Sequence, residues 1–140
     1  LHAPWVSPPS TSQEFQSYLA RVQHPSGAAF VIWEWRSDGF AGIVQITNIL
    51  MDPFRSAHID FFAFSGFEGK GLMKEGLAHV VKQVFRTLKL HRLEANIQPE
   101  NKAAIALAKS CGFKLEGLSP AFMKVGGRWR DHERWALLSA

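Results

Sequence analysis

Cysteine is almost absent from this sequence, because Cys111 is the only one in 140 residues. A single cysteine excludes an internal disulfide framework and fits a reducing compartment, so we expect the protein to be cytoplasmic. Long apolar runs are absent too, since no segment approaches the ~20 residues that a membrane-spanning helix needs. The first ten residues, LHAPWVSPPS, contain no lysine or arginine. They therefore lack the pattern of a secretory signal peptide.

Several kinds of chemical site are missing as well. The six histidines are not spaced as metal ligands, and no second cysteine completes a C-x-x-C pair, so we expect no metal site. No serine stands in a G-x-S-x-G turn, which removes the usual nucleophile of an α/β hydrolase. No run of basic residues alternates with aromatic residues, so we expect no direct binding to nucleic acid.

The length and composition of the sequence predict one globular domain over residues 1–140. The hydrophobic fraction is 46% and the charged fraction is 20%, which is ordinary for a globular chain long enough to bury a core. The net charge of +4 favours an anionic ligand only weakly. The five tryptophans leave a homodimer open.

Hydrophobic periodicity and turn residues predict an alternation of helices and strands. A capping box, Thr11-x-x-Glu14, precedes an apolar stripe at helical spacing, which predicts a first helix from Thr11. Further helices are predicted over Leu72–Leu88 and Lys102–Cys111. Strands are predicted over Ala28–Trp35, Ala41–Ile49, Ala57–Phe64, Leu90–Gln98, Phe113–Leu118, Phe122–Val125 and Trp129–Leu138. This order predicts an α/β (α+β) domain with a mixed, largely antiparallel sheet.

The segment from Phe67 to Met73, FEGKGLM, joins a strand pattern to a long helical pattern. Glycines let the backbone turn sharply and approach a ligand, and the first N–H groups of a helix have no partner within the helix. The helix dipole and the Lys70 ammonium add positive charge. The segment is therefore either a phosphate or pyrophosphate site or a connection without a ligand, and its spacing alone does not decide.

Three blocks of sequence resemble the GNAT superfamily of acyl-CoA-dependent N-acetyltransferases, and within it the RimJ/RimL type that acetylates the N-termini of ribosomal proteins. The blocks are HIDFFAFSGFEGKGLMKEGL, LHRLEANIQPENKAAIALAKSCGFKLEG and GGRWRDHERWALL. Together with Ala3-Pro4-Trp5 they cover nearly the whole chain. The resemblance implies a twisted GNAT-like sheet with helices on both faces. The family has further upstream residues that form a first strand and helix, so we expect this chain to be truncated at its N-terminus relative to the family.

The resemblance also implies which residues bind acetyl-CoA, the co-substrate of the family. Backbone groups of the central strand would bond the pantetheine arm, namely those of Phe61, Phe62, Ala63 and Phe64. Backbone N–H groups of the glycine-rich turn would hold the pyrophosphate, namely those of Gly69, Lys70, Gly71, Leu72 and Met73. Asn101 would bond the pantetheine or the surroundings of the acyl group, and Lys109 would reach the nucleotide phosphate.

Two residues depart from the family pattern. Glu68 places a negative charge at the start of the Q/R-x-x-G-x-G/A motif, beside the expected pyrophosphate. Ala104 stands where the N-x-x-S motif has a serine, which in some relatives is the proposed acid that protonates the leaving thiolate. The only tyrosine, Tyr18, lies far from this region of the sequence. Cys111 and Ser119 remain as weak candidates for the acid.

The base candidates are His58 and Asp60, whose side chains face the same side of the predicted central strand because strands alternate with a period of two. His58 occupies a position where relatives often carry glutamate. An imidazole or a carboxylate there would deprotonate an amine, directly or through water. The alternative is structural, with a hydrogen-bonded histidine and an aspartate that caps backbone groups. Glu34 is a third option.

These observations predict an acetyl-CoA-dependent N-acetyltransferase that transfers acetyl directly to a primary amine in a ternary complex. The expected acceptor is a protein or peptide N-terminal α-amine, such as that of a ribosomal protein. Two alternatives stay open: a small amine such as a polyamine or an amino sugar, and a CoA-binding module without catalysis.

Overall fold

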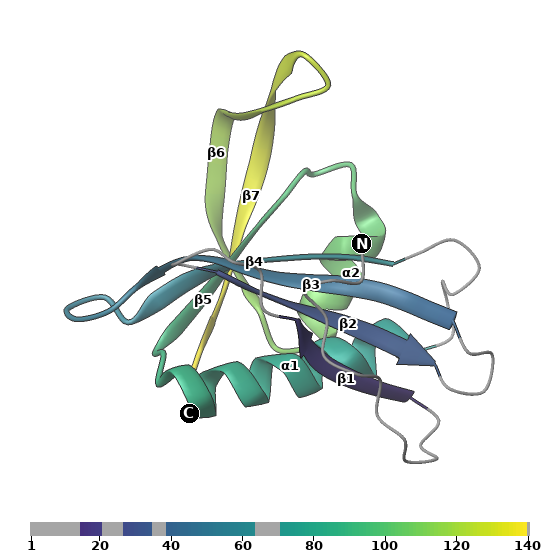
Figure 1. Ribbon diagram of the computed structural model, residues 1–140. Helices are drawn as coiled ribbons and strands as arrows, with labels where there is room; N and C mark the ends of the chain where they lie inside the picture. Colours follow the sequence, from purple (N-terminus) through teal and green to yellow (C-terminus); the bar gives the residue numbers. More distant parts are fainter. Residues whose placement is uncertain (1–14, 21–26, 35–38, 64–70, 140) are drawn as a thin grey trace.

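The structure of the protein is a computed structural model, and it describes residues 15–20, 27–34, 39–63 and 71–139. From β2 onward its elements follow the predicted order of strands and helices, apart from two predicted strands that form one (Figure 1). They are β1 (Phe15–Ala20), β2 (Ala28–Glu34), β3 (Gly39–Leu50), β4 (Ser56–Ala63), α1 (Leu72–Leu88), β5 (Arg92–Ile97), α2 (Lys102–Ser110), β6 (Lys114–Val125) and β7 (Arg128–Leu138). No helix in these ranges is long and apolar enough to cross a membrane.

The strands form one seven-stranded sheet in the order β1-β2-β3-β4-β5-β7-β6. All neighbours are antiparallel except β4 and β5, which are parallel because α1 connects them. The prediction of a mixed, largely antiparallel α/β fold is therefore confirmed.

The prediction of a helix from Thr11 is wrong over the residues that the structure describes. Phe15–Ala20 is a strand that pairs antiparallel with β2, with Phe15 opposite Glu34 and Ala20 opposite Ala29. Phe15, Tyr18 and Leu19 follow helical spacing, but such spacing over six residues is a weak signal, and the pairing with β2 outweighs it. Pairing with β2 also satisfies backbone groups along its edge. The capping box at Thr11 and Glu14 lies outside the described residues.

Helix α1 covers one face of the sheet and forms the main core with it (Figure 1). The predicted stripe is buried, since Leu77, Val80 and Val84 have no exposed surface. Gly76 brings the helix close to β2, because a Cβ at this position would clash with the side chain of Ile32. The predicted inward alternation of β5 is confirmed by its buried residues Leu93, Ala95 and Ile97.

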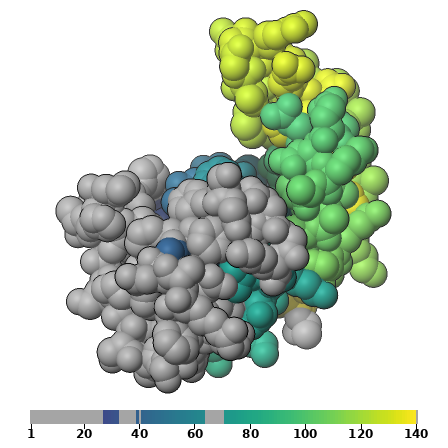
Figure 2. All heavy atoms as spheres, turned by 90° about the vertical axis from the view of Figure 1, so that its right-hand side faces the viewer, coloured from purple at the N-terminus to yellow at the C-terminus, as the bar shows by residue number. Residues whose placement is uncertain are grey.

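The hairpin of β6 and β7 projects beyond the rest of the molecule, where Figure 2 shows its outer part rising above the residues of α2. The sequence predicted two strand segments in place of β6. The structure has one strand with a shift of pairing register between Ser119 and Met123, where Ala121 has a φ of 46°. The inner half of β7 enters the core with Trp135, which is 4% exposed, whereas Trp129 on the outer half is 63% exposed.

Candidate functional site

The central strands β4 and β5 are joined over only three residue pairs, from Ser56–Arg92 to His58–Glu94. Beyond this point β4 continues to Ala63 and β5 continues to Ile97 without pairing, so the two strands diverge. Among the residues that the structure describes, one backbone edge of β4 is consequently left without a neighbouring strand. Such an edge can hydrogen-bond an extended ligand in the manner of an added strand.

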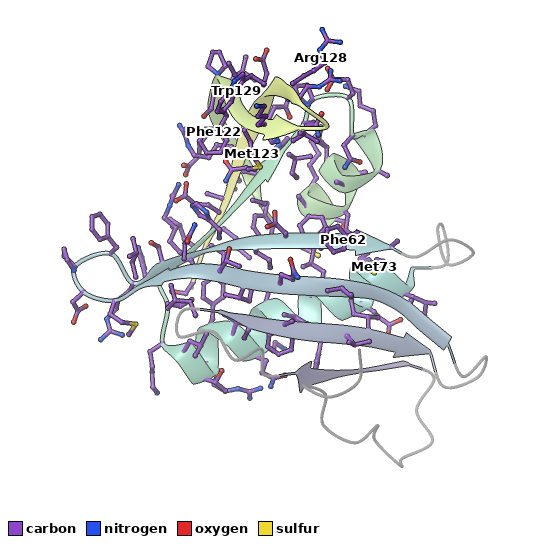
Figure 3. All side chains as sticks on the ribbon, turned by 45° about the horizontal axis from the view of Figure 1, so that its top comes forward. Phe62, Met73, Phe122, Met123, Arg128 and Trp129 are labelled. Carbon is purple, nitrogen blue, oxygen red and sulfur yellow. The ribbon has the colours of Figure 1, made fainter. Side chains whose placement is uncertain are left out.

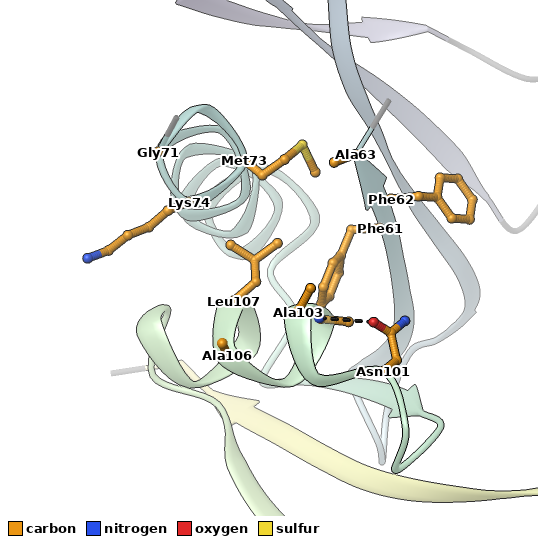
Figure 4. Close-up of a pocket in the computed structure, with 11 residues that line it drawn as sticks. Phe61, Phe62, Ala63, Gly71, Met73, Lys74, Asn101, Ala103, Ala106 and Leu107 are labelled. Carbon is orange, nitrogen blue, oxygen red and sulfur yellow. Dashed lines mark hydrogen bonds between the residues drawn. The ribbon is translucent and has the colours of Figure 1, made fainter. Parts of the chain in front are cut away.

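A cavity of about 540 Å³ lies beside this edge, between β4 and the two helices (Figure 4). We call it the helix-side cavity. Figure 4 shows Phe61 pointing into it toward α2, while Phe62 points to the other side of β4. Its walls are mostly apolar, and they include six of the residues predicted to bind the co-substrate: Phe61, Phe62, Ala63, Gly71, Met73 and Asn101.

The N-terminus of α1 opens onto the helix-side cavity. Gly71 adopts a left-handed conformation with φ 76°, and none of the described side chains caps the helix. The first intrahelical bond runs from the N–H of Glu75 to the carbonyl of Gly71, so the N–H groups before Glu75 precede the helical ladder. Lys74 also lines the cavity, and its ammonium adds to the positive end of the helix dipole. This end of the cavity is suited to an anion such as a phosphate.

Asn101 sits where α2 begins and lines the helix-side cavity. Its side-chain Oδ1 accepts a hydrogen bond from the N–H of Ala104 at 3.2 Å, which makes Asn101 the N-cap of α2. Ala104, which replaces the serine of the family motif, lines the cavity as well. The methyl group of Ala104 cannot donate a proton.

A second cavity, of about 230 Å³, occupies the gap where β4 and β5 diverge and is closed by residues of the β6–β7 hairpin. We call it the hairpin-side cavity. It shares Phe61, Phe62, Asn101 and Ala104 with the helix-side cavity, so the two are adjacent. Figure 3 shows the hairpin residues Phe122 and Met123 above the strand that carries Phe62. Asp60 and His132 are the ionisable residues among those described in its wall.

Asp60 faces the hairpin-side cavity from β4. Its side chain is open to solvent, yet loss of hydration among the surrounding protein atoms raises the pKa of the carboxyl. The nearby His58 and His132 act in the opposite direction and lower this pKa to a smaller extent. The predicted shared face of His58 and Asp60 is confirmed by their pairing with Thr47 and Gln45 of β3.

His58 lies further from the cavities, since it is absent from the described lining of both. Its Nδ1 is 3.1 Å from the side-chain Nδ2 of Asn48. Because an amide nitrogen only donates, Nδ1 of His58 accepts this bond, and the neutral ring carries its proton on Nε2. His58 therefore influences the pKa of Asp60 electrostatically, while its ring is held by the side chain of Asn48 on β3.

The remaining predicted residues are not gathered at one place. Leu72 is buried under the sheet at 7% exposure. Lys109 lies over the ring of Trp135, 5.9 Å from its centroid, and lines a separate cavity on another side of α2. Burial raises the pKa of the half-buried Cys111 thiol, which lies near the backbone carbonyl of Lys74. Phe64, Glu68, Gly69 and Lys70 lie outside the described residues, as does the side chain of Glu34.

Sequence reasoning missed His132, which is 3% exposed and lines the hairpin-side cavity. A signal was available, because strand alternation places His132 on the opposite face of β7 from the core residue Trp135. Within the described residues, no three His, Cys, Asp or Glu side chains are grouped as metal ligands.

A family model described as an acetyltransferase (GNAT) domain matches residues 2–114. The chain is 32% identical to the probable N-acetyltransferase YjcK of Bacillus subtilis over 87% of this chain and 67% of that protein. It is 31% identical to the [ribosomal protein uS5]-alanine N-acetyltransferase of Escherichia coli over 81% of this chain and 60% of that protein.

Two solved structures share the fold. One is Mycobacterium smegmatis RimJ in complex with CoA-disulfide, with 33% identity, a TM-score of 0.77 and coverage of 84% of this chain and 55% of that one. The other is a mutant of the spermidine N-acetyltransferase SpeG from Vibrio cholerae, with 25% identity, a TM-score of 0.72 and coverage of 83% of this chain and 66% of that one. The chain thus spans only part of the length of these proteins.

Proposed function

The chain belongs to the GNAT acetyltransferase family, and from this premise we propose that it transfers the acetyl group of acetyl-CoA to a primary amine, with a protein or peptide N-terminal α-amine as the favoured acceptor. The observation that carries the proposal is the open edge of β4 at which the helix-side and hairpin-side cavities meet. Two substrates that enter from opposite sides would meet at this edge. Holding them in register would supply a large part of the rate.

The helix-side cavity is the proposed site for acetyl-CoA. Its apolar walls and the free edge of β4 suit the pantetheine arm, and the open N-terminus of α1 beside Gly71 and Lys74 suits the pyrophosphate. Phe64, Gly69 and Lys70 remain predicted contacts of the same ligand. Lys109 is a proposed contact only with the nucleotide end, because it faces another side of α2.

The hairpin-side cavity is the proposed site for the amine. Asp60 supplies a negative charge that attracts an ammonium group, and His58 moderates that charge from the same face of β4. A strand N–H near Phe61 would polarise the thioester oxygen. With Ala104 in place of a hydroxyl donor, the thiolate would leave without a proton from this position.

The favoured acceptor rests on similarity to the uS5-alanine and RimJ enzymes. A polyamine is the second candidate, favoured by the similarity to SpeG and by the carboxylate in the cavity. The cytoplasmic location and the homodimer stay predictions.

The test is calorimetry with acetyl-CoA, followed by release of free thiol with a panel of amines. We expect acetyl-CoA to bind and a peptide that begins with alanine to be turned over faster than spermidine. If spermidine were turned over and the peptide were not, a small amine would replace the peptide as the proposed acceptor. Binding without turnover by any amine would leave a CoA-binding module, and absence of binding would contradict the proposal entirely.

A further inference from the structure

His132 on β7 is an ionisable residue that is almost completely buried, with 3% of its surface exposed. It lies in the wall of the hairpin-side cavity, opposite Ser119 in the β6–β7 pairing, with its ring 5.8 Å from the ring of Phe122 between centroids. A buried polar side chain normally satisfies its hydrogen-bonding groups. The hydrogen bonds of His132 therefore indicate what its ring can do.

One ring nitrogen of His132 has a partner that fixes the tautomer. Nδ1 lies 3.0 Å from the backbone carbonyl of Arg130. A carbonyl oxygen only accepts, so Nδ1 carries the proton and Nε2 of the neutral ring has a free lone pair. No described residue hydrogen-bonds Nε2. His58 has the opposite tautomer, because its Nδ1 accepts from Asn48, so its Nε2 has no lone pair to offer.

The surroundings of His132 suit a neutral amine. The hairpin-side cavity holds about 230 Å³, which is the room of several water molecules at roughly 30 Å³ each. Apolar side chains such as Ile59, Ile97 and Met123 form part of its wall, and this part disfavours a charged ammonium once Asp60 no longer balances it. In the described part of the wall, Asp60 is the only other ionisable group.

We propose that Nε2 of His132 takes the proton from the acceptor amine and that the Asp60 carboxylate holds the ammonium beside it. This inference rests on the proposed function and names the base for that reaction. Asp60 also stabilises the imidazolium that forms, as a carboxylate next to a cation does.

The proton balance is as follows for a protonated amine and acetyl-CoA. Nε2 of His132 takes the first proton, and the freed nitrogen lone pair forms a bond with the thioester carbonyl carbon. The carbon–sulfur bond then breaks, and the sulfur takes a second proton from the amine nitrogen. The amide keeps the third proton, and the imidazolium releases its proton to water.

The groups around His132 set the conditions for a pH profile. On β4, Asp60 interacts electrostatically with His132, and His58 lies on the same face of that strand as Asp60. On its own strand, Arg130 and Arg134 share its side of the pleat. On β6 the paired residue is Ser119, which does not titrate in this range.

The test compares the pH–rate profiles of the whole protein and two variants, His132→Asn and His132→Ala. Asparagine can still donate to the Arg130 carbonyl but has no base at the position of Nε2. We expect kcat to fall by about 100-fold or more in both variants, as for loss of a general base, with the KM for acetyl-CoA unchanged. The rise in kcat with increasing pH, which loss of the proton from the base produces, should be lost in both variants. Added imidazole should restore turnover to His132→Ala and leave His132→Asn unchanged.

A second measurement does not depend on how the variants fold. The ring ¹⁵N shifts of His132 in the unaltered protein report its tautomer, and we expect a neutral ring that carries its proton on Nδ1 and none on Nε2. A neutral ring protonated on Nε2 would overturn the inference. If the folded His132→Asn variant acetylated amines at the wild-type rate, the inference would be overturned while the proposed function stands. Absence of turnover by the unaltered protein with every amine would overturn both.

Discussion

Replacing Gly71 with alanine separates the folding role of this residue from its proposed contact with acetyl-CoA. Gly71 has φ 76°, and a Cβ at this position meets no atom within 4 Å. Backbone strain is then the only folding cost, roughly 1–2 kcal/mol for a residue with a side chain in the left-handed region. At about 2–4 °C per kcal/mol, we expect the melting temperature to fall by about 2–8 °C.

Binding of acetyl-CoA should fall by more than this strain explains. The added methyl group would occupy the open space in front of the α1 N-terminus, where the helix-side cavity ends. Displacement of one charge-assisted hydrogen bond to a phosphate costs about 1.5–3 kcal/mol. That energy corresponds to roughly a 10- to 100-fold weaker Kd.

Gly126 provides a matched control in the turn between β6 and β7. It has φ 60°, a Cβ there also meets nothing within 4 Å, and it lines neither cavity. Gly126→Ala should therefore lose similar stability and bind acetyl-CoA with the wild-type Kd. Calorimetry and thermal unfolding of both variants check this. Equal Kd values for Gly71→Ala and Gly126→Ala would refute the assignment of the α1 N-terminus as the pyrophosphate site.

Three further variants probe the same account. Asp60→Asn should slow turnover and raise the melting temperature at pH 7. Because folding raises the pKa of Asp60, its charge costs stability at neutral pH, and the gain from Asn should vanish as pH falls below the ordinary carboxyl pKa of 3.8. A constant gain at all pH values would contradict the reasoning. Gly76→Ala should destabilise the protein by about 1–3 kcal/mol in chemical denaturation through overpacking against Ile32, and an unchanged midpoint would refute that contact. Glu116→Gln should cost less than about 1 kcal/mol because the pair with Arg92 is partly exposed. Since Arg92 lowers the pKa of Glu116, that difference should be present at neutral pH and lost as pH falls through the range below 4.5, whereas persistence at low pH would argue against the ion pair.

The sequence predicted the elements whose patterns are long or marked by turn residues. The apolar stripe of α1 corresponds to the structure because it runs through 17 residues, and β5 corresponds because its sequence RLEANI alternates strictly between polar and apolar residues. Phe15–Ala20 could not be assigned in this way, because its apolar residues follow helical spacing and only the pairing with β2 makes it a strand.

The residues around the helix-side cavity were predicted from the family resemblance. Phe61, Gly71 and Asn101 come together because the divergence of β4 from β5 places them around one cavity. His132 was missed because its role depends on the β6–β7 hairpin closing over β4, and strand alternation does not specify that contact. Lys109 was predicted from the family resemblance and its place along the helix, and its position over Trp135 depends on how α2 packs.

The most direct test of the central claim is mass spectrometry of a peptide that begins with alanine after incubation with the protein and acetyl-CoA. The account predicts that the peptide gains one acetyl group on its α-amine, at a rate that depends on both substrates, and that a peptide with a blocked N-terminus gains none. An unmodified peptide, in the presence of protein shown by calorimetry to bind acetyl-CoA, would contradict the claim that the two cavities bring an amine and a thioester together.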